Sequence, residues 1–127
     1  MAALVRLDTH VVVWLYTADV DKLSPTAIDL IESNDISISP MVELELTYLH
    51  EIGRLGTTGA DIVNDLAARI GLQTSTVPLQ QLVHVAAGLS WTRDPFDRMI
   101  TADASISATR LVTKDAVIRA NYPLALW

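Results

Sequence analysis

Four acidic residues have the types and spacing that could support metal-dependent chemistry, and two of them follow predicted β-strands. Asp8 follows the apolar segment Ala2–Leu7, and Asp115 follows the segment Arg110–Thr113. Parallel sheets bind ligands at the carboxyl ends of their strands, so both carboxylates are expected at one edge. Taken singly, each could instead cap a helix or occupy a turn. Together they predict an acidic site at that edge.

Glu45 is the third candidate, because it lies within the apolar stripe of a helix predicted over 40–52. At about 100° per residue, the apolar residues within roughly 60° of it are Met41, Val42, Tyr48, Leu49 and Ile52. Glu43 falls about 160° away and is expected in solvent. A carboxylate on an apolar face needs a cation or hydrogen-bond donors. Glu45 is therefore either a site residue or a buried structural acid.

Asp97 is the fourth candidate, and it lies near the start of a helix predicted over 94–108. Asp94 before a proline is typical of an N-cap, and Asp97 is an acid in the first turn, where the helix dipole favours it. The residues on its face are Thr101, Ala104 and Ala108, a narrow stripe that could pack closely on a sheet. Asp97 should then point to the rim of the sheet, whereas Asp103, about 120° away, is expected in solvent.

Carboxylates brought together repel one another and have raised pKa values unless a cation neutralises them. Oxygen ligands favour a hard ion such as Mg²⁺ or Mn²⁺. The absence of cysteine and the separation of His10, His50 and His84 disfavour zinc. A hard ion can hold a phosphoryl oxygen and lower the pKa of a water that attacks a phosphodiester. The acids therefore predict hydrolysis of a phosphodiester.

Predicted strands and helices alternate along the chain, which is typical of an α/β fold with a mostly parallel sheet. The strands are expected over 2–7, 35–39, 73–77, 110–113 and 122–127, the last at an edge. The helices are expected over 10–18, 24–33, 40–52, 59–70, 79–88, 94–108 and 115–120. Ser24 and Ser39 stand before prolines as start signals, and Gly71 is a stop signal.

Composition limits the classes of protein to consider. A chain of 127 residues with 50% hydrophobic and 19% charged residues fits a single domain over 1–127. Its net charge of −6 disfavours a generic basic coat for nucleic acid. The longest apolar run, Val11–Tyr16, is far shorter than the roughly 18 residues of a membrane helix. Asp8 and His10 interrupt any signal peptide, so we expect the cytoplasm and no membrane.

Four segments in combination resemble PIN-domain ribonucleases of the VapC toxin type, from bacterial toxin–antitoxin pairs. They are LDTHVVVWL at 7–15, ISPMVELELTYLHEIGRL at 38–55, DPFDRMITADA at 94–104 and LVTKD at 111–115. The resemblance covers nearly the whole chain. Asp103 stands where a glutamine is frequent, and Ala108 or Thr109 stands where a glycine is usual. Neither departure removes a predicted acid.

The resemblance implies a PIN-like three-layer sandwich, in which helices cover both faces of a twisted parallel sheet. It also implies endonucleolytic cleavage of RNA with Mg²⁺ or Mn²⁺. By motif, Asp8, Glu45 and Asp97 would be metal ligands, and Asp115 would be a fourth catalytic acid that orients the attacking water. A VapB-like antitoxin would block the metal pocket, and the toxin would form a homodimer.

An RNA substrate has to be reconciled with the negative net charge. Many of the basic residues lie between 93 and 119, namely Arg93, Arg98, Arg110, Lys114 and Arg119. They could form a local basic rim that contacts phosphates, or they could be separate solvated side chains with Arg98 paired to Asp94. Arg98 is the candidate substrate contact among them. The resemblance adds the hydroxyls of Thr9 and Thr113 beside the acids.

Two other classes stay open. A receiver-like phosphoacceptor domain also gathers acids at strand ends with Mg²⁺, but the predicted strand 35–39 ends without a phosphoacceptor aspartate. A catalytically inactive PIN-like module could bind RNA or protein without turnover. The presence of all four acids disfavours that reading.

Overall fold

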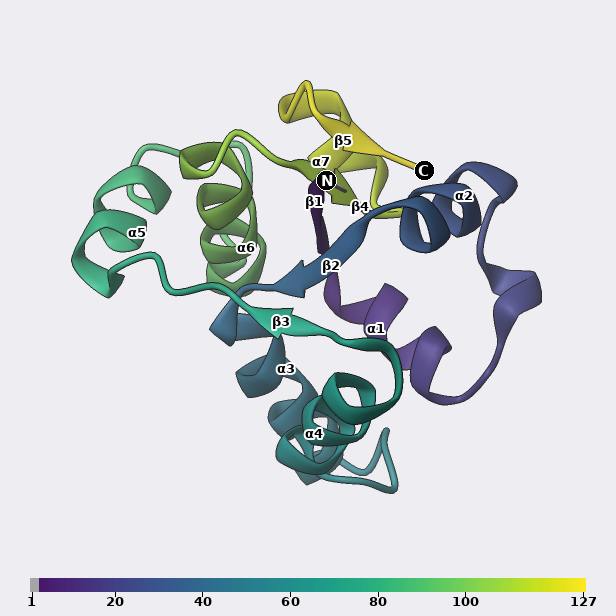
Figure 1. Ribbon diagram of the computed structural model, residues 1–127. Helices are drawn as coiled ribbons and strands as arrows, with labels where there is room; N and C mark the ends of the chain where they lie inside the picture. The colour runs from purple at the N-terminus through teal and green to yellow at the C-terminus, as the bar shows by residue number, and fades with distance from the viewer. Residues whose placement is uncertain (1–2) are drawn as a thin grey trace.

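A five-stranded parallel sheet forms the centre of the computed structural model, which describes residues 3–127 (Figure 1). The strands are β1 (Leu4–Leu7), β2 (Asp35–Ile38), β3 (Gln73–Thr74), β4 (Arg110–Val112) and β5 (Ala125–Leu126). Their order is β3-β2-β1-β4-β5, and every neighbouring pair is parallel. The parallel sheet and its last edge strand are as predicted, although Ala2 lies outside the described residues.

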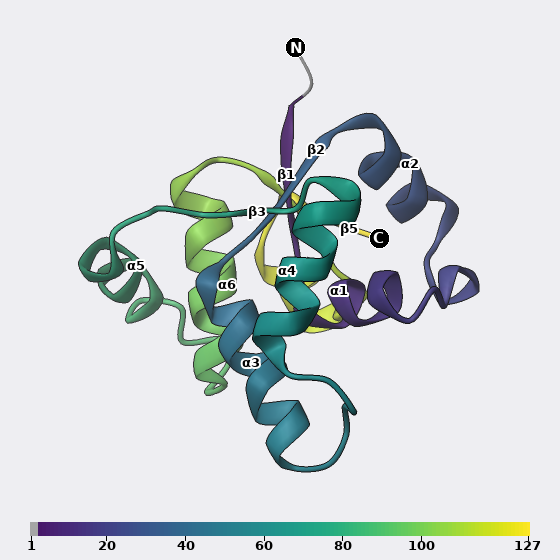
Figure 2. The ribbon, with the colours of Figure 1, turned by 60° about the horizontal axis from the view of Figure 1, so that its bottom comes forward.

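Helices cover both faces of this sheet. They are α1 (Thr9–Tyr16), α2 (Pro25–Ser33), α3 (Pro40–Glu51), α4 (Gly59–Ile70), α5 (Leu79–Ala86), α6 (Pro95–Ile106) and α7 (Ala116–Asn121). Figure 2 shows α1, α2 and α4 on one side of the sheet and α5 and α6 on the other. The three-layer α/β fold is therefore confirmed. None of the helices formed by residues 3–127 has the length and apolar character needed to cross a bilayer.

Short polar residues fix where the helices begin, as the sequence indicated. Ser24 Oγ accepts a hydrogen bond from Ala27 N at 3.0 Å, and Ser39 Oγ accepts one from Met41 N at 3.2 Å. Each bond satisfies a backbone donor that the first helical turn leaves free. Gly71 ends α4 in the left-handed conformation, with a φ of 73°. The 3₁₀ turn η1 (Val20–Lys22) was not predicted, because three residues show no periodicity.

By register, most of the buried apolar residues of the central strands share one face of the sheet, namely Val5, Leu7, Ile36, Ile38 and Val112. The opposite face carries Leu111 together with the buried polar residues Arg6 and Ser37. A second, smaller core lies between α5 and α6 and contains Leu82, Ala86, Met99 and Ala102. Helix α6 is therefore held between the sheet and α5.

A buried ion pair also fixes α6 against β1, and it corrects one prediction. Arg6 Nε lies 2.9 Å from Asp103 Oδ1, and Asp103 is fully buried instead of solvated. The remaining Arg6 donors reach the hydroxyls of Ser37, Ser75 and Ser107. A helical wheel could not reveal that a buried cation on the central strand would face this side of the helix. The pair sets the position of the helix that carries Asp97.

Candidate active site

The four predicted acids line one cleft of about 430 Å³ beyond the carboxyl ends of β1 and β4. Asp8 and Asp115 follow these two strands, while Glu45 comes from α3 and Asp97 from α6. The strands β1 and β4 are neighbours in the sheet, but the chain goes from β1 to β2 in one direction along the strand order and from β4 to β5 in the opposite direction. Ligands of open α/β sheets bind at such a switch point.

Asp8 is a helix cap and a cleft residue at once. It is 4% exposed, and its Oδ1 accepts a hydrogen bond from Thr9 N at 2.8 Å. Its Oδ2 accepts one from Thr113 Oγ1 at 2.6 Å. Thr113 Oγ1 also accepts a bond from Asp115 N at 3.1 Å. One hydroxyl thus ties together the two acids that follow β1 and β4.

Glu45 lies half-buried at the edge of the apolar face of α3, not at its centre. The buried residues of this helix are Val42 and Leu46, whereas Tyr48 is 49% exposed. Glu43 is exposed, as predicted. The predicted stripe is therefore displaced around the helix, because the wheel cannot tell which apolar residues the rest of the fold covers.

The carboxyl group of Glu45 is supported by Thr9, whose hydroxyl donates to Oε1. Burial raises the pKa of Glu45, while the Thr9 hydrogen bond acts in the opposite direction. The negative charges of Asp8 and Asp94 raise this pKa further. The carboxyl group is thus held by one hydroxyl in a negative environment.

Asp97 is the acid whose environment is most unfavourable to charge. Its pKa is raised to about 7, first by burial and then by the carboxylates of Asp94, Asp8, Asp115 and Glu45. The N-terminus of α6 does not compensate this repulsion, although a helix N-terminus ordinarily favours an acid. Asp97 therefore titrates near neutral pH when no cation is bound.

Asp94 and Asp115 repeat the double role of Asp8. Asp94 Oδ1 accepts hydrogen bonds from Phe96 N at 2.8 Å and Asp97 N at 3.3 Å, so it caps α6 as predicted. It also lines the cleft, which the sequence did not suggest. Asp115 caps α7, its Oδ1 accepting from Val117 N at 2.8 Å.

His10 is a further cleft residue that sequence reasoning missed. Its Nε2 accepts a hydrogen bond from Lys114 N at 2.9 Å, and its Nδ1 lies 3.6 Å from Asp8 Oδ2. Burial lowers the pKa of His10, against the opposing charges of Asp8 and Asp115, and the nearby Lys114 lowers it further. A neutral ring can accept the Lys114 N–H, so His10 ties the turn after β4 to α1. Its place two residues after Asp8 was the only signal.

Comparison with known proteins identifies the family. The family model of the PIN domain matches residues 5–122. The chain belongs to the PIN domain family. It is 32% identical over 129 residues to Ribonuclease VapC22 of Mycobacterium tuberculosis, and the match covers 97% of this chain and 98% of that relative. The resemblance to VapC-type PIN domains is thereby confirmed, and the receiver-like alternative is set aside.

Two solved structures share the fold of this PIN domain. VapBC2 from Rickettsia felis, bound to a DNA fragment from its promoter, superposes with a TM-score of 0.66 at 18% identity. A toxin–antitoxin complex from Klebsiella pneumoniae gives a TM-score of 0.63 at 15% identity. Each match covers 97% of this chain and 96% of the other. At this identity the likeness establishes the fold alone.

The basic side chains do not assemble as one rim around the PIN-domain cleft. Arg98 Nε donates to Thr92 O at 2.8 Å and its Nη1 lies 3.5 Å from Ala86 O, so Arg98 neither pairs with Asp94 nor lines the cleft. Arg110 begins β4, at the end opposite to the acids. The exposed Arg54, which was not predicted, does line the cleft.

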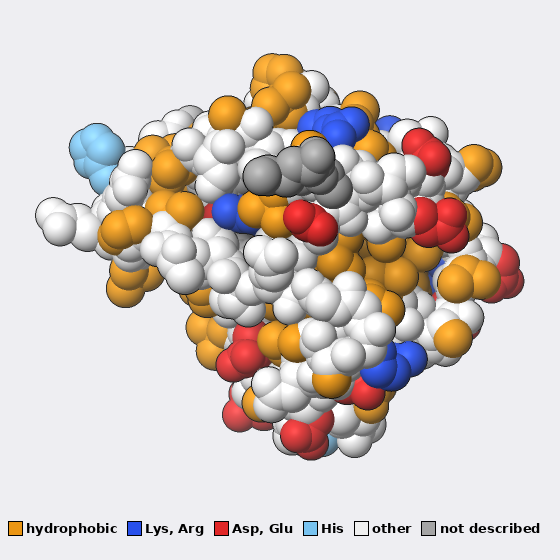
Figure 3. All heavy atoms as spheres, viewed as in Figure 1, with side chains coloured by type: hydrophobic (Ala, Val, Ile, Leu, Met, Phe, Trp, Pro, Cys, Tyr) orange, Lys and Arg blue, Asp and Glu red, His pale blue; other side chains and the backbone are white. Residues whose placement is uncertain are grey.

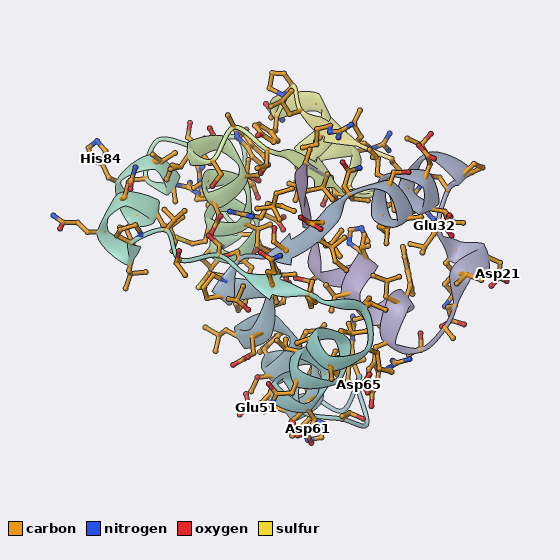
Figure 4. The ribbon with its side chains drawn as sticks, viewed as in Figure 1. Asp21, Glu32, Glu51, Asp61, Asp65 and His84 are labelled. Carbon is orange, nitrogen blue, oxygen red and sulfur yellow. The ribbon has the colours of Figure 1, made fainter. Side chains whose placement is uncertain are left out.

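Acidic side chains also lie outside the cleft. Figure 3 shows acidic side chains over the lower part and the right-hand side of one face, with few basic ones between them. The acids labelled in Figure 4 lie on the periphery and are Asp21, Glu32, Glu51, Asp61 and Asp65. His84 points outward from α5 in the same view. The cleft is thus one part of a broadly negative molecule.

The donor set of the cleft suits a hard cation, but the acids surround the cleft instead of meeting at one point. Within residues 3–127, no three acidic or histidine side chains are gathered closely enough to form a ready-made ion cage. The raised pKa of Asp97 follows first from its burial and then from the unneutralised carboxylates around it. The acids that could hold an ion are Asp8, Glu45, Asp97 and Asp115, and all offer oxygen ligands.

Proposed function

We propose that this PIN domain is a Mg²⁺-dependent endoribonuclease toxin, which hydrolyses phosphodiester bonds of RNA and is neutralised by a cognate VapB-like antitoxin. The observation that carries the proposal is that four acids, from four separate segments, line one cleft. The similarity to Ribonuclease VapC22 over almost the full length of both chains supports RNA as the substrate.

Asp8, Glu45 and Asp97 would hold Mg²⁺ or Mn²⁺, which supplies positive charge for a phosphoryl oxygen and lowers the pKa of a water molecule. Thr113 keeps the Asp8 carboxylate in place, and Thr9 does the same for Glu45. Asp97 must lose its proton to act as a ligand, so we expect cation binding to strengthen as the pH rises through about 7.

Asp115 would orient the attacking water. Its backbone N–H donates to Thr113, and its Oδ1 accepts from Val117 N and Ile118 N, so two bonds hold one carboxylate oxygen and a third holds the backbone. A carboxylate fixed in this way loses little freedom when it accepts a hydrogen bond from water. We therefore expect Asp115→Asn to lower kcat more than it raises KM.

The proposed partners are RNA, the antitoxin and a second copy of the chain, all in the cytoplasm. The two solved structures named above are toxin–antitoxin assemblies, which supports an antitoxin as a partner. Several large apolar side chains are exposed and could contact protein partners. Among them are Leu44 and Tyr48 on α3, Ile52 directly after it, and Leu79 and Val83 on α5.

Cleavage of total RNA by the wild type and by Asp97→Asn, each with and without EDTA, tests the proposal. Cleavage is expected only for the wild type without EDTA. Asp61→Asn is the matched control, because Asp61 is also a first-turn acid but lies on α4, away from the cleft. Equal cleavage under every condition would contradict the assignment.

The ends of the products test the mechanism separately. Attack by water leaves a 5′-phosphate and a 3′-hydroxyl, and these ends are expected. A 2′,3′-cyclic phosphate would show attack by the ribose hydroxyl and would refute the roles given to the acids.

The second candidate function is a catalytically inactive module that binds RNA or protein. The observation in its favour is that the acids surround the cleft without forming an ion cage among residues 3–127. Wild-type protein that binds RNA but does not turn it over with Mg²⁺ or Mn²⁺ would establish this alternative.

A further inference from the structure

A shallow hollow adjoins the acidic cleft and is continuous with it. The hollow has a volume of about 350 Å³ and is lined by His10, Trp14, Lys114 and Asp115. His10, Trp14 and Asp115 also line the acidic cleft. These three side chains therefore border both spaces, and a chain molecule that lies in one space can extend into the other.

Three aromatic rings meet at this border and form an aromatic wall. The ring centroids of His10 and Trp14 are 5.1 Å apart, and those of Trp14 and Trp127 are 5.9 Å apart. Trp14 and Trp127 are partly buried and pack against the main core. The indole of Trp14 is thus held by its neighbours while part of it faces the hollow. A flat ring that is already fixed loses little entropy when it accepts a ligand.

A single cation stands over this aromatic wall. Lys114 Nζ lies 5.8 Å from the centroid of the Trp14 ring, and Lys114 is exposed. Its backbone N–H is bound to His10, so the base of the side chain is fixed although the ammonium group can move. The hollow therefore offers an aromatic face and a positive charge next to a cleft whose acids repel phosphates.

We propose that Trp14 and Lys114 form a subsite for single-stranded RNA, in which an unpaired nucleobase stacks on the Trp14 indole and Lys114 contacts a neighbouring phosphate. This inference rests on the proposed function, because it places the strand beside the cleft where hydrolysis would occur. A net charge of −6 and an acidic cleft give RNA little long-range attraction. Stacking supplies affinity that does not depend on charge.

The same geometry selects the form of the RNA. An indole face can stack only on a base that is free of its own neighbours, so the subsite favours single strands, loops and ends over continuous duplex. Every base has a π-face, so the subsite tolerates different sequences. A protein partner could also contact Trp14, but its binding would not depend on nucleobases.

Binding can be measured without cleavage by using tryptophan fluorescence in EDTA. The double variant Trp91→Phe/Trp127→Phe leaves Trp14 as the only indole among the three tryptophans of the chain. A short single-stranded RNA is expected to quench this emission. An abasic strand of the same length and an RNA duplex of the same sequence should quench far less. Equal quenching by the abasic strand or the duplex, or no quenching by any of the three, would overturn the subsite.

Variants test the two contacts separately in the otherwise unaltered protein. Trp14→Leu keeps an apolar side chain but removes the π-face, so we expect the affinity for the single strand to fall by about 5- to 150-fold, the range for loss of one stacked base. Lys114→Gln is expected to reduce the slope of log K against log salt by about 0.7, the value for one phosphate contact of a single strand. Lys22→Gln is the matched control, because Lys22 is the other lysine of the chain and lines neither the hollow nor the cleft, and it should change neither quantity.

Kinetics distinguish failure of this inference from failure of the proposed function. If the wild type cleaves RNA, Trp14→Leu should raise KM much more than it lowers kcat. A wild-type KM in this variant would refute the subsite and leave the nuclease intact. Conversely, wild-type protein that does not cleave but distinguishes the single strand from the abasic strand by quenching would refute the nuclease and retain the subsite.

Discussion

Removing the charge of Asp97 should stabilise the protein when no cation is present. The fold disfavours the ionised form of this residue, because burial and four neighbouring carboxylates raise its pKa from 3.8 to about 7. At about 1.4 kcal/mol per unit, this shift corresponds to about 4 kcal/mol. Asp97 is only half-buried, so water screens part of the repulsion and we reduce the figure to about 2 kcal/mol.

The sign of the effect depends on pH. Below the unfolded pKa, near 4, the carboxyl group of Asp97 is protonated in both states, and the fold carries no penalty. The penalty grows as the pH rises and is complete above the folded pKa, near 7. Asp97→Asn should therefore raise the free energy of unfolding by about 2 kcal/mol at about pH 8 and hardly at all at about pH 4.

Urea unfolding in EDTA at both pH values measures this difference. The control Asp61→Asn replaces an exposed first-turn acid of α4 and should cost a few tenths of a kcal/mol at about pH 8, through the helix dipole alone. Adding Mg²⁺ should stabilise the wild type more than Asp97→Asn. A stability change of Asp97→Asn that is negative, or that is equal at both pH values, would show that burial and the neighbouring carboxylates do not disfavour the charged form as inferred.

Three further substitutions test how the cleft is held. Thr113→Val removes the hydrogen bonds to Asp8 Oδ2 and Asp115 N, so it should lower the free energy of urea unfolding by about 1–3 kcal/mol and slow RNA cleavage. Wild-type values for both quantities would refute the role of Thr113 as a bridge. Arg6→Met leaves Asp103 buried and unpaired, so it should lower the free energy of unfolding by about 3–5 kcal/mol. The double variant Arg6→Met/Asp103→Leu should recover much of that free energy. Equal losses in the two variants would mean that packing, not charge, fixes α6. Gly59→Ala places a Cβ 2.4 Å from Glu43 O, so a melting temperature equal to that of the wild type would contradict the close packing of α4 on α3.

Local signals in the sequence were sufficient to predict the elements of the fold. A serine before a proline starts α2 and α3, and a glycine ends α4, because capping depends only on neighbouring residues. The order of strands and helices then indicated the parallel sheet. The turn η1 was beyond this kind of reasoning, since it has no side-chain cap and no repeated apolar pattern.

Contacts between distant segments were harder to predict. Arg6 and Asp103 are 97 positions apart, and nothing near either residue indicates the other. The helical wheel of α3 gave the angle of each residue correctly but not the side that the fold covers, which is why Glu45 lies at an edge. His10 was missed for the same reason, because its partner Lys114 follows a different strand.

The choice between helix cap and site residue, which the sequence left open for Asp8 and Asp115, is a false alternative in this fold, and Asp94 has the same double role. Each of these acids uses Oδ1 to accept backbone N–H groups at the start of a helix. A helix that directly follows a parallel strand must begin at the carboxyl end of that strand, which is where the sheet forms its cleft. Capping therefore holds Asp8 and Asp115 at the edge of the sheet where Glu45 and Asp97 also line the cleft. The same bonds that stabilise the helices position the acids, so a substitution such as Asp115→Asn, which can still accept these N–H groups, separates the chemical role from the structural one.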